Sequence, residues 1–284
     1  MLPDRLHAYL ITDPFIILST IFVGTISVAS SLFDGQGRAQ HKLAQVWGRM
    51  LCFAARVRLT VEGAEKVEPG RPYIFVANHA SFMDIPVLLK ALPVEMRFLA
   101  KKSLFTIPFM GWHLGRAGHV PVDLDDPRCA VRTLSAAAVL VRERGIPVLL
   151  FPEGGRVVKG LDPFKDGAAY LAIKSGATII PVGVAGTRHI LPMDRFFFIR
   201  PGPVTVRFGD PIPVAGIGMK QRESLTRRLR DAVAALLPEA DGGTLDSSAT
   251  VPGLAQVSGN CCWHRSWSTV AEIRDGRSGC PGWW

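Results

Sequence analysis

Cysteine is scarce in this sequence, which has five among its 284 residues. Cys52 and Cys129 lie in apolar helical patterns, and the other three, Cys261, Cys262 and Cys280, lie near the C-terminus. Neither group has the spacing of metal ligands. We therefore expect no catalytic metal, and so few thiols fit a reducing cytosolic setting.

Several catalytic and binding motifs are also absent from the sequence. There is no Gly-x-Ser-x-Gly, which argues against a serine hydrolase. The Gly-Gly-Arg run at residues 154–156 lacks the lysine of a mononucleotide-binding loop. Zinc-finger spacing and RNA-recognition aromatic motifs are missing too, so nucleic acid is a poor candidate partner.

Acidic residues are outnumbered by basic ones. The chain has 33 lysines and arginines against 24 aspartates and glutamates, a formal net charge of +9. The excess lies in residues 1–238, which hold 30 basic and 19 acidic side chains. A basic body of this kind suits an anionic membrane surface or a phosphorylated substrate.

No charged residue occurs in the 19 residues from Phe15 to Phe33. This length just reaches what is needed to cross a bilayer core of about 30 Å. Serines, threonines and Gly24 weaken insertion, so a shallow embedded helix is an alternative to a crossing one. A cleaved signal peptide and a soluble core helix are further alternatives. The signal peptide is disfavoured because the one preceding base, Arg5, is offset by Asp4 and Asp13.

Basic residues follow the uncharged run at Arg38, Lys42 and Arg49, which would place the rest of the chain on the cytoplasmic side. From Leu43 to Ala54 apolar residues recur with a helical period. This helix could pack on the next domain or lie in the membrane interface with its basic face toward anionic lipid. Residues 1–55 are thus predicted to form membrane-associated helices.

Residues 56–238 alternate between strand and helix patterns. The predicted strands are Val57–Glu62, Tyr73–Ala77, Arg97–Ala100, His119–Val122, Pro147–Phe151, Thr178–Val184 and Val204–Phe208. The predicted helices are Met83–Ala91, Leu104–Leu114, Arg128–Arg144, Gly167–Ser175 and Lys220–Leu237. This pattern predicts an α/β fold, a layered mixed sheet of about seven strands flanked by helices. Residues 239–284 show neither period and are predicted to be a disordered tail.

A histidine and an aspartate lie at the end of one predicted strand, His79 and Asp84 in Asn-His-Ala-Ser-Phe-Met-Asp. On one continuous helix, residues five apart would point about 140° away from each other. They can meet only if His79 lies in a turn and Asp84 in the first turn of the following helix. The carboxylate would then hold one ring nitrogen and leave the other to act as a general base. No nucleophile accompanies the pair, which suggests that the substrate brings its own hydroxyl.

A second polar group follows another predicted strand, at Glu153, Gly154, Gly155 and Arg156. The glycines allow the backbone to approach an anion, and arginine can bind phosphate in a bidentate manner. Lys101 and Lys102 could add positive charge nearby. The alternative is a solvated turn with a surface ion pair.

The ordered motifs resemble those of the glycerolipid acyltransferases typified by 1-acylglycerol-3-phosphate acyltransferase. Asn78, His79 and Asp84 match the family's Asn-His-x4-Asp, and residues 151–157, Phe-Pro-Glu-Gly-Gly-Arg-Val, resemble its Phe-Pro-Glu-Gly-Thr-Arg-Ser. Pro163–Gly167 and the short motif Ile180-Pro181-Val182 follow in order. The resemblance covers roughly residues 38–215. It implies that His79 and Asp84 are catalytic and that Glu153, Gly154 and Arg156 bind the glycerol-phosphate acceptor. Gly155, Lys101 and Pro181 are further candidate substrate-binding residues.

The sequence departs from the family at the second motif, where Leu124 replaces a phosphate-binding arginine. Gly155 and Val157 replace the threonine and serine of the third motif. These changes leave the acceptor headgroup open.

The resemblance implies transfer of a fatty acyl group from acyl-CoA or acyl-carrier protein to lysophosphatidic acid at a cytoplasmic or inner membrane. No cofactor is expected beyond the thioester co-substrate. The alternatives are another lysolipid acceptor (a lysophospholipid or a lyso-aminolipid), a thioester hydrolase, and a non-catalytic lipid-binding scaffold. Acyl-chain length and oligomeric state stay open.

Overall fold

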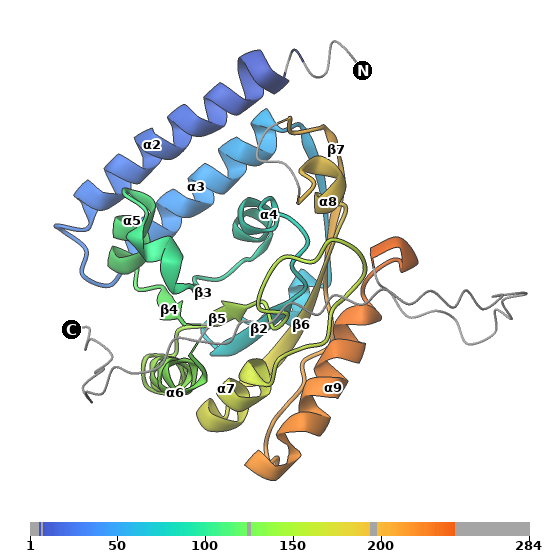
Figure 1. Cartoon of the computed structure of the whole chain (residues 1–284). Coiled ribbons are helices and arrows are strands. Elements are labelled where there is room, and N and C mark those ends of the chain that lie inside the picture. Colours follow the sequence, from blue (N-terminus) through green and yellow to red (C-terminus); the bar gives the residue numbers. More distant parts are fainter. Residues whose placement is uncertain (1–5, 7, 124–125, 194–197, 242–284) are drawn as a thin grey trace, which may run out of the picture. The chain divides into compact units, whose positions relative to one another are not determined.

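The computed structural model describes residues 6, 8–123, 126–193 and 198–241, which all fall in one compact unit. Seven strands form a single sheet in the order β1-β7-β6-β2-β5-β3-β4 (Figure 1). Neighbouring strands are parallel except β6 and β7, which are antiparallel. The predicted mixed sheet flanked by helices is therefore confirmed. Leu124 and the predicted tail beyond residue 241 lie outside the described residues.

The strands agree closely with the predicted ones. They are β1 Val57–Glu62, β2 Tyr73–Ala77, β3 Arg97–Lys101, β4 Val120–Val122, β5 Val148–Leu150, β6 Thr178–Ala185 and β7 Gly202–Phe208. The helices are α2 Asp13–Ser30, α3 Arg38–Ala54, α4 Asp84–Ala91, α5 Met110–Arg116, α6 Pro127–Arg144, α7 Gly167–Ser175, α8 Thr187–Ile190 and α9 Arg222–Ala234.

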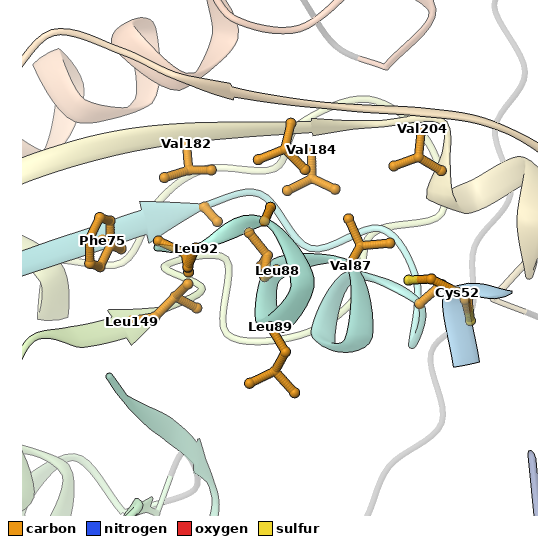
Figure 2. Close-up of a cluster of buried hydrophobic side chains, with 14 of the residues drawn as sticks. Cys52, Phe75, Val87, Leu88, Leu89, Leu92, Leu149, Val182, Val184 and Val204 are labelled. Atoms are coloured by element: carbon orange, nitrogen blue, oxygen red, sulfur yellow. The ribbon is translucent and has the colours of Figure 1, made fainter. Parts of the chain in front are cut away.

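The central strand β2 is buried along its whole length and feeds two apolar layers. Because successive side chains alternate across a strand, Tyr73, Phe75 and Ala77 face one layer and Ile74 and Val76 the other. Helices α3 and α4 cover the first layer, in which Phe75 lies near Val182 of β6, Leu149 of β5 and Leu92 at the end of α4 (Figure 2). Helices α6, α7 and α9 cover the second. The sheet is thus fixed from both faces, which holds its strand ends in place.

The N-terminal helix α2 buries several polar side chains and exposes most of its large apolar ones. It buries Asp13, Ser19 and Ser27, while Leu18 and Phe22 are 66% and 64% exposed. The helical stretch Ala8–Ser30, which contains α2, is long and apolar enough to cross a membrane, and 28% of its most apolar part is buried, whereas the core helix of a soluble protein is mostly buried. Such an inverted pattern is typical of a helix whose outer face meets lipid.

Polar contacts bind α2 to the rest of the unit. Trp47 of α3 donates from Nε1 to Oγ1 of Thr20 at 2.9 Å. The backbone N–H of Phe198 donates to Asp13 at 3.1 Å. α2 and α3 lie side by side in Figure 1. These contacts make α2 an integral part of the described unit.

The predicted helix Leu104–Leu114 is wrong as one continuous element. The chain instead forms a short 3-10 helix, Lys102–Thr106, and then α5 from Met110. Pro108 causes the interruption, because proline lacks an N–H and disfavours the helical conformation of the residue before it. Ile107 accordingly has an extended ψ of 124°.

Candidate active site

The two predicted polar groups meet at one edge of the sheet. β2 and β5 are parallel neighbours, so the chain leaves both strands at the same edge. His79 follows β2 directly, and Glu153 follows β5. The turn after β2 and the loop after β5 therefore face each other.

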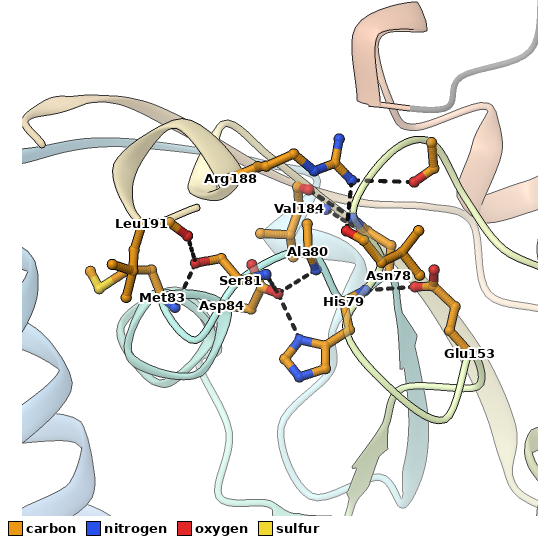
Figure 3. A network of polar contacts seen from close by, with 12 residues as sticks. Asn78, His79, Ala80, Ser81, Met83, Asp84, Glu153, Val184, Arg188 and Leu191 are labelled. Atoms are coloured by element: carbon orange, nitrogen blue, oxygen red, sulfur yellow. Dashed lines mark hydrogen bonds and ion pairs between the residues drawn. The ribbon is translucent and has the colours of Figure 1, made fainter. Parts of the chain in front are cut away.

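His79 and Asp84 form the predicted pair. Nδ1 of His79 lies 2.8 Å from Oδ2 of Asp84 (Figure 3). Because a carboxylate only accepts hydrogen bonds, the neutral ring carries its proton on Nδ1 and a lone pair on Nε2. His79 is partly exposed while Asp84 is fully buried. The geometry predicted for a general base and the residue that orients it is thus present.

Asp84 also shapes the turn that carries the histidine. Its Oδ2 accepts the backbone N–H groups of Ala80 and Ser81 at 2.8 Å and 2.9 Å. Asp84 is the first residue of α4, where the helix dipole favours a negative charge. Its Oδ1 has no partner within the described residues. One carboxylate oxygen therefore fixes both the backbone turn and the imidazole ring.

The backbone of His79 is held on both sides by the loop after β5. Its N–H donates to Oε1 of Glu153 at 2.7 Å, and its carbonyl accepts the N–H of Val157 at 2.8 Å. Oε2 of Glu153 accepts the N–H of Asp162 at 3.2 Å. Glu153 therefore acts as a positioning residue for His79; its predicted contact with the acceptor stays a prediction.

Glu153 is buried, and this changes its ionisation. Burial raises the pKa of Glu153 to about 7, although the two backbone N–H groups that it accepts oppose the shift. The side chain thus titrates near neutral pH at a position that supports the histidine.

Asn78 and Phe151 fix the histidine turn from two further directions. The side-chain amide of Asn78 exchanges two hydrogen bonds with the backbone of Val184 in β6, at 2.9 Å and 2.8 Å. The ring of Phe151 stacks on the imidazole of His79 with centroids 4.1 Å apart. Ser81 donates to the carbonyl of Leu191 at 2.7 Å. These contacts restrain the turn so that His79 keeps one orientation.

Arg156 stacks on the aromatic ring of Phe82, near enough to Asp84 to be influenced by its charge. Its guanidinium carbon is 3.6 Å from the ring centroid of Phe82. Burial lowers the pKa of Arg156, and the charge of Asp84 opposes that shift. Nη1 is buried without a partner within the described residues. An arginine N–H group without a partner in the described residues can donate a hydrogen bond to an anionic ligand.

Gly154 has the left-handed backbone that its motif requires. Its φ is +79°, and a Cβ there would lie 2.7 Å from Nζ of Lys165. A side chain at this position would be strained and would displace the lysine. The Gly154 backbone and Lys165 therefore lie close together, and the lysine adds positive charge to the loop.

The remaining predicted residues are placed less closely. Gly155 is exposed in the same loop, and Lys101 is exposed at the end of β3. Pro181 is buried within β6 opposite Val76, inside the sheet rather than at its edge. The roles of these three residues stay predictions, and Leu124 is outside the described residues.

The supporting roles of Phe82, Phe151 and Arg188 were missed by the sequence analysis. Both aromatic residues lie inside the quoted motifs, but spacing does not show which ring faces which partner. Arg188 of α8 donates to the carbonyls of Val157 and Gly160, far along the chain from either motif. No local sequence signal identifies such a contact.

Comparisons with known proteins show which proteins this chain is similar to. The acyltransferase family model matches residues 58–185. A 1-acyl-sn-glycerol-3-phosphate acyltransferase of Chlamydomonas reinhardtii is 34% identical over 229 residues, covering 79% of this chain and 67% of the relative. The corresponding protein of Saccharomyces cerevisiae is 29% identical, covering 81% and 77%. A chloroplastic relative from Brassica napus is 35% identical, and the chain spans about half of it (53%).

The fold is similar to a solved structure as well. The crystal structure of the 1-acyl-sn-glycerophosphate (LPA) acyltransferase PlsC from Thermotoga maritima aligns with a TM-score of 0.68 at 26% identity. The alignment covers 81% of this chain and 94% of that one.

Proposed function

Because the chain belongs to the acyltransferase family that includes the 1-acyl-sn-glycerol-3-phosphate acyltransferases, we propose that it acylates lysophosphatidic acid. The donor is an acyl thioester and the product is phosphatidic acid. The observation that carries the proposal is the 2.8 Å contact between His79 and Asp84, which leaves Nε2 of the imidazole open.

The reaction needs no nucleophile from the protein. Nε2 of His79 takes the proton from the acceptor hydroxyl while its oxygen attacks the thioester carbonyl. Asp84 holds the ring and stabilises the imidazolium that forms. When the tetrahedral intermediate collapses, the carbon–sulfur bond breaks and the thiol leaves with the proton from His79. General-base catalysis of this kind contributes about 10²–10⁴-fold, and binding both substrates side by side contributes further.

The phosphate of the acceptor is assigned to the loop after β5. Arg156, with one open nitrogen, and the exposed Lys165 beside Gly154 supply positive charge there. Another lysolipid acceptor remains the alternative, because Leu124, Gly155 and Val157 replace polar residues of the family motifs. The donor carrier, CoA or acyl-carrier protein, is left open by these residues.

We assign the reaction to a membrane surface. The outward apolar face of α2 supports contact with lipid, and the contacts of α2 with Trp47 and Phe198 support its retention in the mature protein. Arg38, Lys42 and Arg49 after α2 favour a catalytic domain on the cytoplasmic side. The acceptor would then reach the site from the plane of the bilayer.

A matrix of donors and acceptors tests this function. The purified full-length chain is assayed with acyl-CoA and acyl-carrier protein against lysophosphatidic acid, other lysophospholipids and a lyso-aminolipid. We expect preference for the phosphomonoester acceptor and thiol release that depends on the acceptor. Thiol release without acceptor would indicate a hydrolase, and equal rates on all headgroups would contradict the acceptor assignment.

The variant His79→Ala tests the mechanism in the same assay. We expect His79→Ala to lower kcat by about 10²–10⁴-fold with thermal stability maintained, because the general base is lost. The matched control is His189→Ala, which removes an exposed histidine of α8. Retained turnover in His79→Ala would refute the proposed base.

A further inference from the structure

The connection between β3 and β4 exposes a group of large apolar side chains. Residues 107–112, which we call the apolar turn, carry four of them: Ile107, Phe109, Met110 and Trp112, exposed by 43%, 44%, 42% and 55%. Phe109 and Trp112 form an edge-to-face pair with centroids 5.2 Å apart. Aqueous surfaces expose such side chains singly, and a compact group marks a contact surface.

The apolar turn has a tightly built backbone. Phe109 adopts φ 62°, a left-handed conformation that is costly for an aromatic residue. A Cβ on Gly111 would clash with the carbonyl oxygen of Phe105, so only glycine fits there. N–H groups of Met110 and Gly111 donate to the carbonyls of Pro108 and Ile107, both at 2.7 Å. The exposure is therefore a property of a defined turn.

The apolar turn adjoins the lipid-facing helix. His113, one residue beyond Trp112, contacts Oγ of Ser27 in α2 at 2.6 Å, and α5 packs on α2 (Figure 1). The end of α2 is followed by Leu32 and Phe33, exposed by 74% and 93%. The apolar surface of α2 thus continues into a second element from the middle of the sequence.

Exposed basic residues border the apolar turn. Lys101 and Lys102 precede it and Arg116 ends α5. Aromatic side chains flanked by lysine and arginine are typical of elements that sit at the boundary of an anionic bilayer. A protein partner would not account for the continuity with α2.

We propose that the apolar turn inserts into the lipid leaflet that contacts α2, as a second and separate membrane anchor. This inference rests on the membrane assignment made under the proposed function. The turn joins β3 and β4, and β3 ends at the same sheet edge as β2, which leads to His79. Anchoring at this point fixes the orientation of that edge to the bilayer, so that the acceptor can reach His79 without leaving the lipid surface.

Quenching of Trp112 fluorescence tests the insertion. The full-length protein and its Trp112→Phe variant are reconstituted in nanodiscs of phosphatidylcholine and phosphatidylglycerol, with and without brominated acyl chains. The difference between the two spectra isolates the Trp112 indole. We expect that difference to be quenched by brominated lipid and protected from aqueous iodide. Quenching by iodide with no effect of brominated lipid would overturn the proposal.

Kinetics of Met110→Asp provide an independent test. We expect its KM for a long-chain acceptor in the bilayer to rise about tenfold, since burying a charge in lipid opposes docking. Its kcat on a short-chain, monomeric acceptor should stay within about twofold of wild type, because the chemistry is untouched. Val139→Asp is the matched control, since Val139 lies on α6 and is 43% exposed. Ile107→Ser serves as a second variant if Met110→Asp lowers thermal stability.

The outcomes separate this inference from the proposed function. An equal KM increase in Met110→Asp and Val139→Asp would refute the apolar turn as an anchor. A wild-type chain that fails on both acceptors would refute the acyltransferase assignment. A chain that turns over both acceptors but does not sediment with vesicles would refute the membrane assignment.

Discussion

Two buried carboxyl groups support the same histidine in different ways. Asp84 contacts the ring of His79, whereas Glu153 contacts its backbone N–H. The first contact selects the tautomer, and the second selects where the ring stands. A histidine in a turn needs both, because the ring direction depends on the backbone as well as on the side-chain angles.

Glu153→Gln should change how stability depends on pH. Burial raises the pKa of Glu153 from 4.5 to about 7, so the folded protein binds a proton that the unfolded chain lacks between these values. Wild-type stability therefore falls as pH rises from about 4.5 to about 7. Glutamine removes this dependence. As pH rises from 5 to 8, the free energy of unfolding of Glu153→Gln should increase relative to that of wild type by at most about 3 kcal/mol. Thermal unfolding at both pH values measures this change.

Glu65→Gln is the control for this measurement, because it makes the same substitution at an exposed position. If wild type and Glu153→Gln kept a constant stability difference from pH 5 to pH 8, the carboxyl group would be ionised throughout. Its two backbone contacts would then outweigh its burial.

The residue pair itself was predictable, and its surroundings were not. Asn78, His79 and Asp84 are close in sequence, and a turn followed by a helix start leaves few ways to arrange them. The stacking of Arg156 on Phe82 and of Phe151 on His79 depends on how two distant loops meet. Spacing along the chain contains no information of that kind.

At the scale of elements, the loop after β5 is tied to the segment that follows α9. Arg188 of α8 donates from Nη2 to the carbonyls of Val157 and Gly160 at 3.4 Å and 3.3 Å. From Nη1 it donates to Asp241 at 3.1 Å. The N–H of Val157 in turn holds the carbonyl of His79. Arg188 is therefore a positioning residue that acts on the histidine turn through a single residue of the loop, Val157.

Arg188→Ala should lower kcat about tenfold and raise the acceptor KM, because the loop that carries Arg156 loses its support. Asp241→Ala should have a smaller effect in the same direction. The loss of activity in the double variant, expressed as activation free energy, should be smaller than the sum of the losses in the two single variants by about 1 kcal/mol. Arg188→Lys should restore part of the rate, since a cation remains but the fork of donors does not. Steady-state kinetics of the four variants measure these terms.

Arg207→Ala is the matched control for Arg188. Arg207 of β7 also bonds a carboxylate and a carbonyl, Glu62 and Leu236, but on the outer strands of the sheet. Equal kinetic losses in Arg207→Ala and Arg188→Ala at equal stability would show that general loosening, rather than loop positioning, causes the effect.

Elements were predictable where burial leaves a clear pattern. All five residues of β2 are buried, and the apolar run at Tyr73–Ala77 identifies it. The helix expected at Leu104–Leu114 was wrong because its apolar residues have helical spacing, yet Pro108 interrupts them. Four of these apolar residues, Ile107, Phe109, Met110 and Trp112, are exposed. The sequence pattern also did not predict that β6 pairs with β7 in an antiparallel manner, because the direction of a strand depends on the path of the long connection that precedes it.

At the scale of the whole molecule, three histidines lie where the N-terminal helices meet the sheet. His41 of α3 is buried, and His113 and His119 lie on the chain between β3 and β4 with the buried Arg97 of β3 nearby. Burial, and then the charge of Arg97, lowers the pKa of His41 to about 4, and the charge of Glu95 partly offsets this. Burial also lowers the pKa values of His113 and His119. The environment of this junction therefore favours the neutral form of all three imidazoles.

Acid should therefore weaken the junction between the helices and the sheet. The unfolded His41 takes up a proton near pH 6.5 and the folded one only near pH 4, so stability is lost as pH falls between these values. His41→Leu removes this contribution and two ring nitrogens that have no partner within the described residues. It should be as stable as wild type or more so at pH 8, and its advantage should grow by about 2 kcal/mol at pH 5. Thermal unfolding at both pH values measures this difference, with the exposed His189→Leu as the matched control. A His41→Leu protein that loses stability at pH 8 and gains nothing at pH 5 would show that the imidazole makes a favourable contact at the junction.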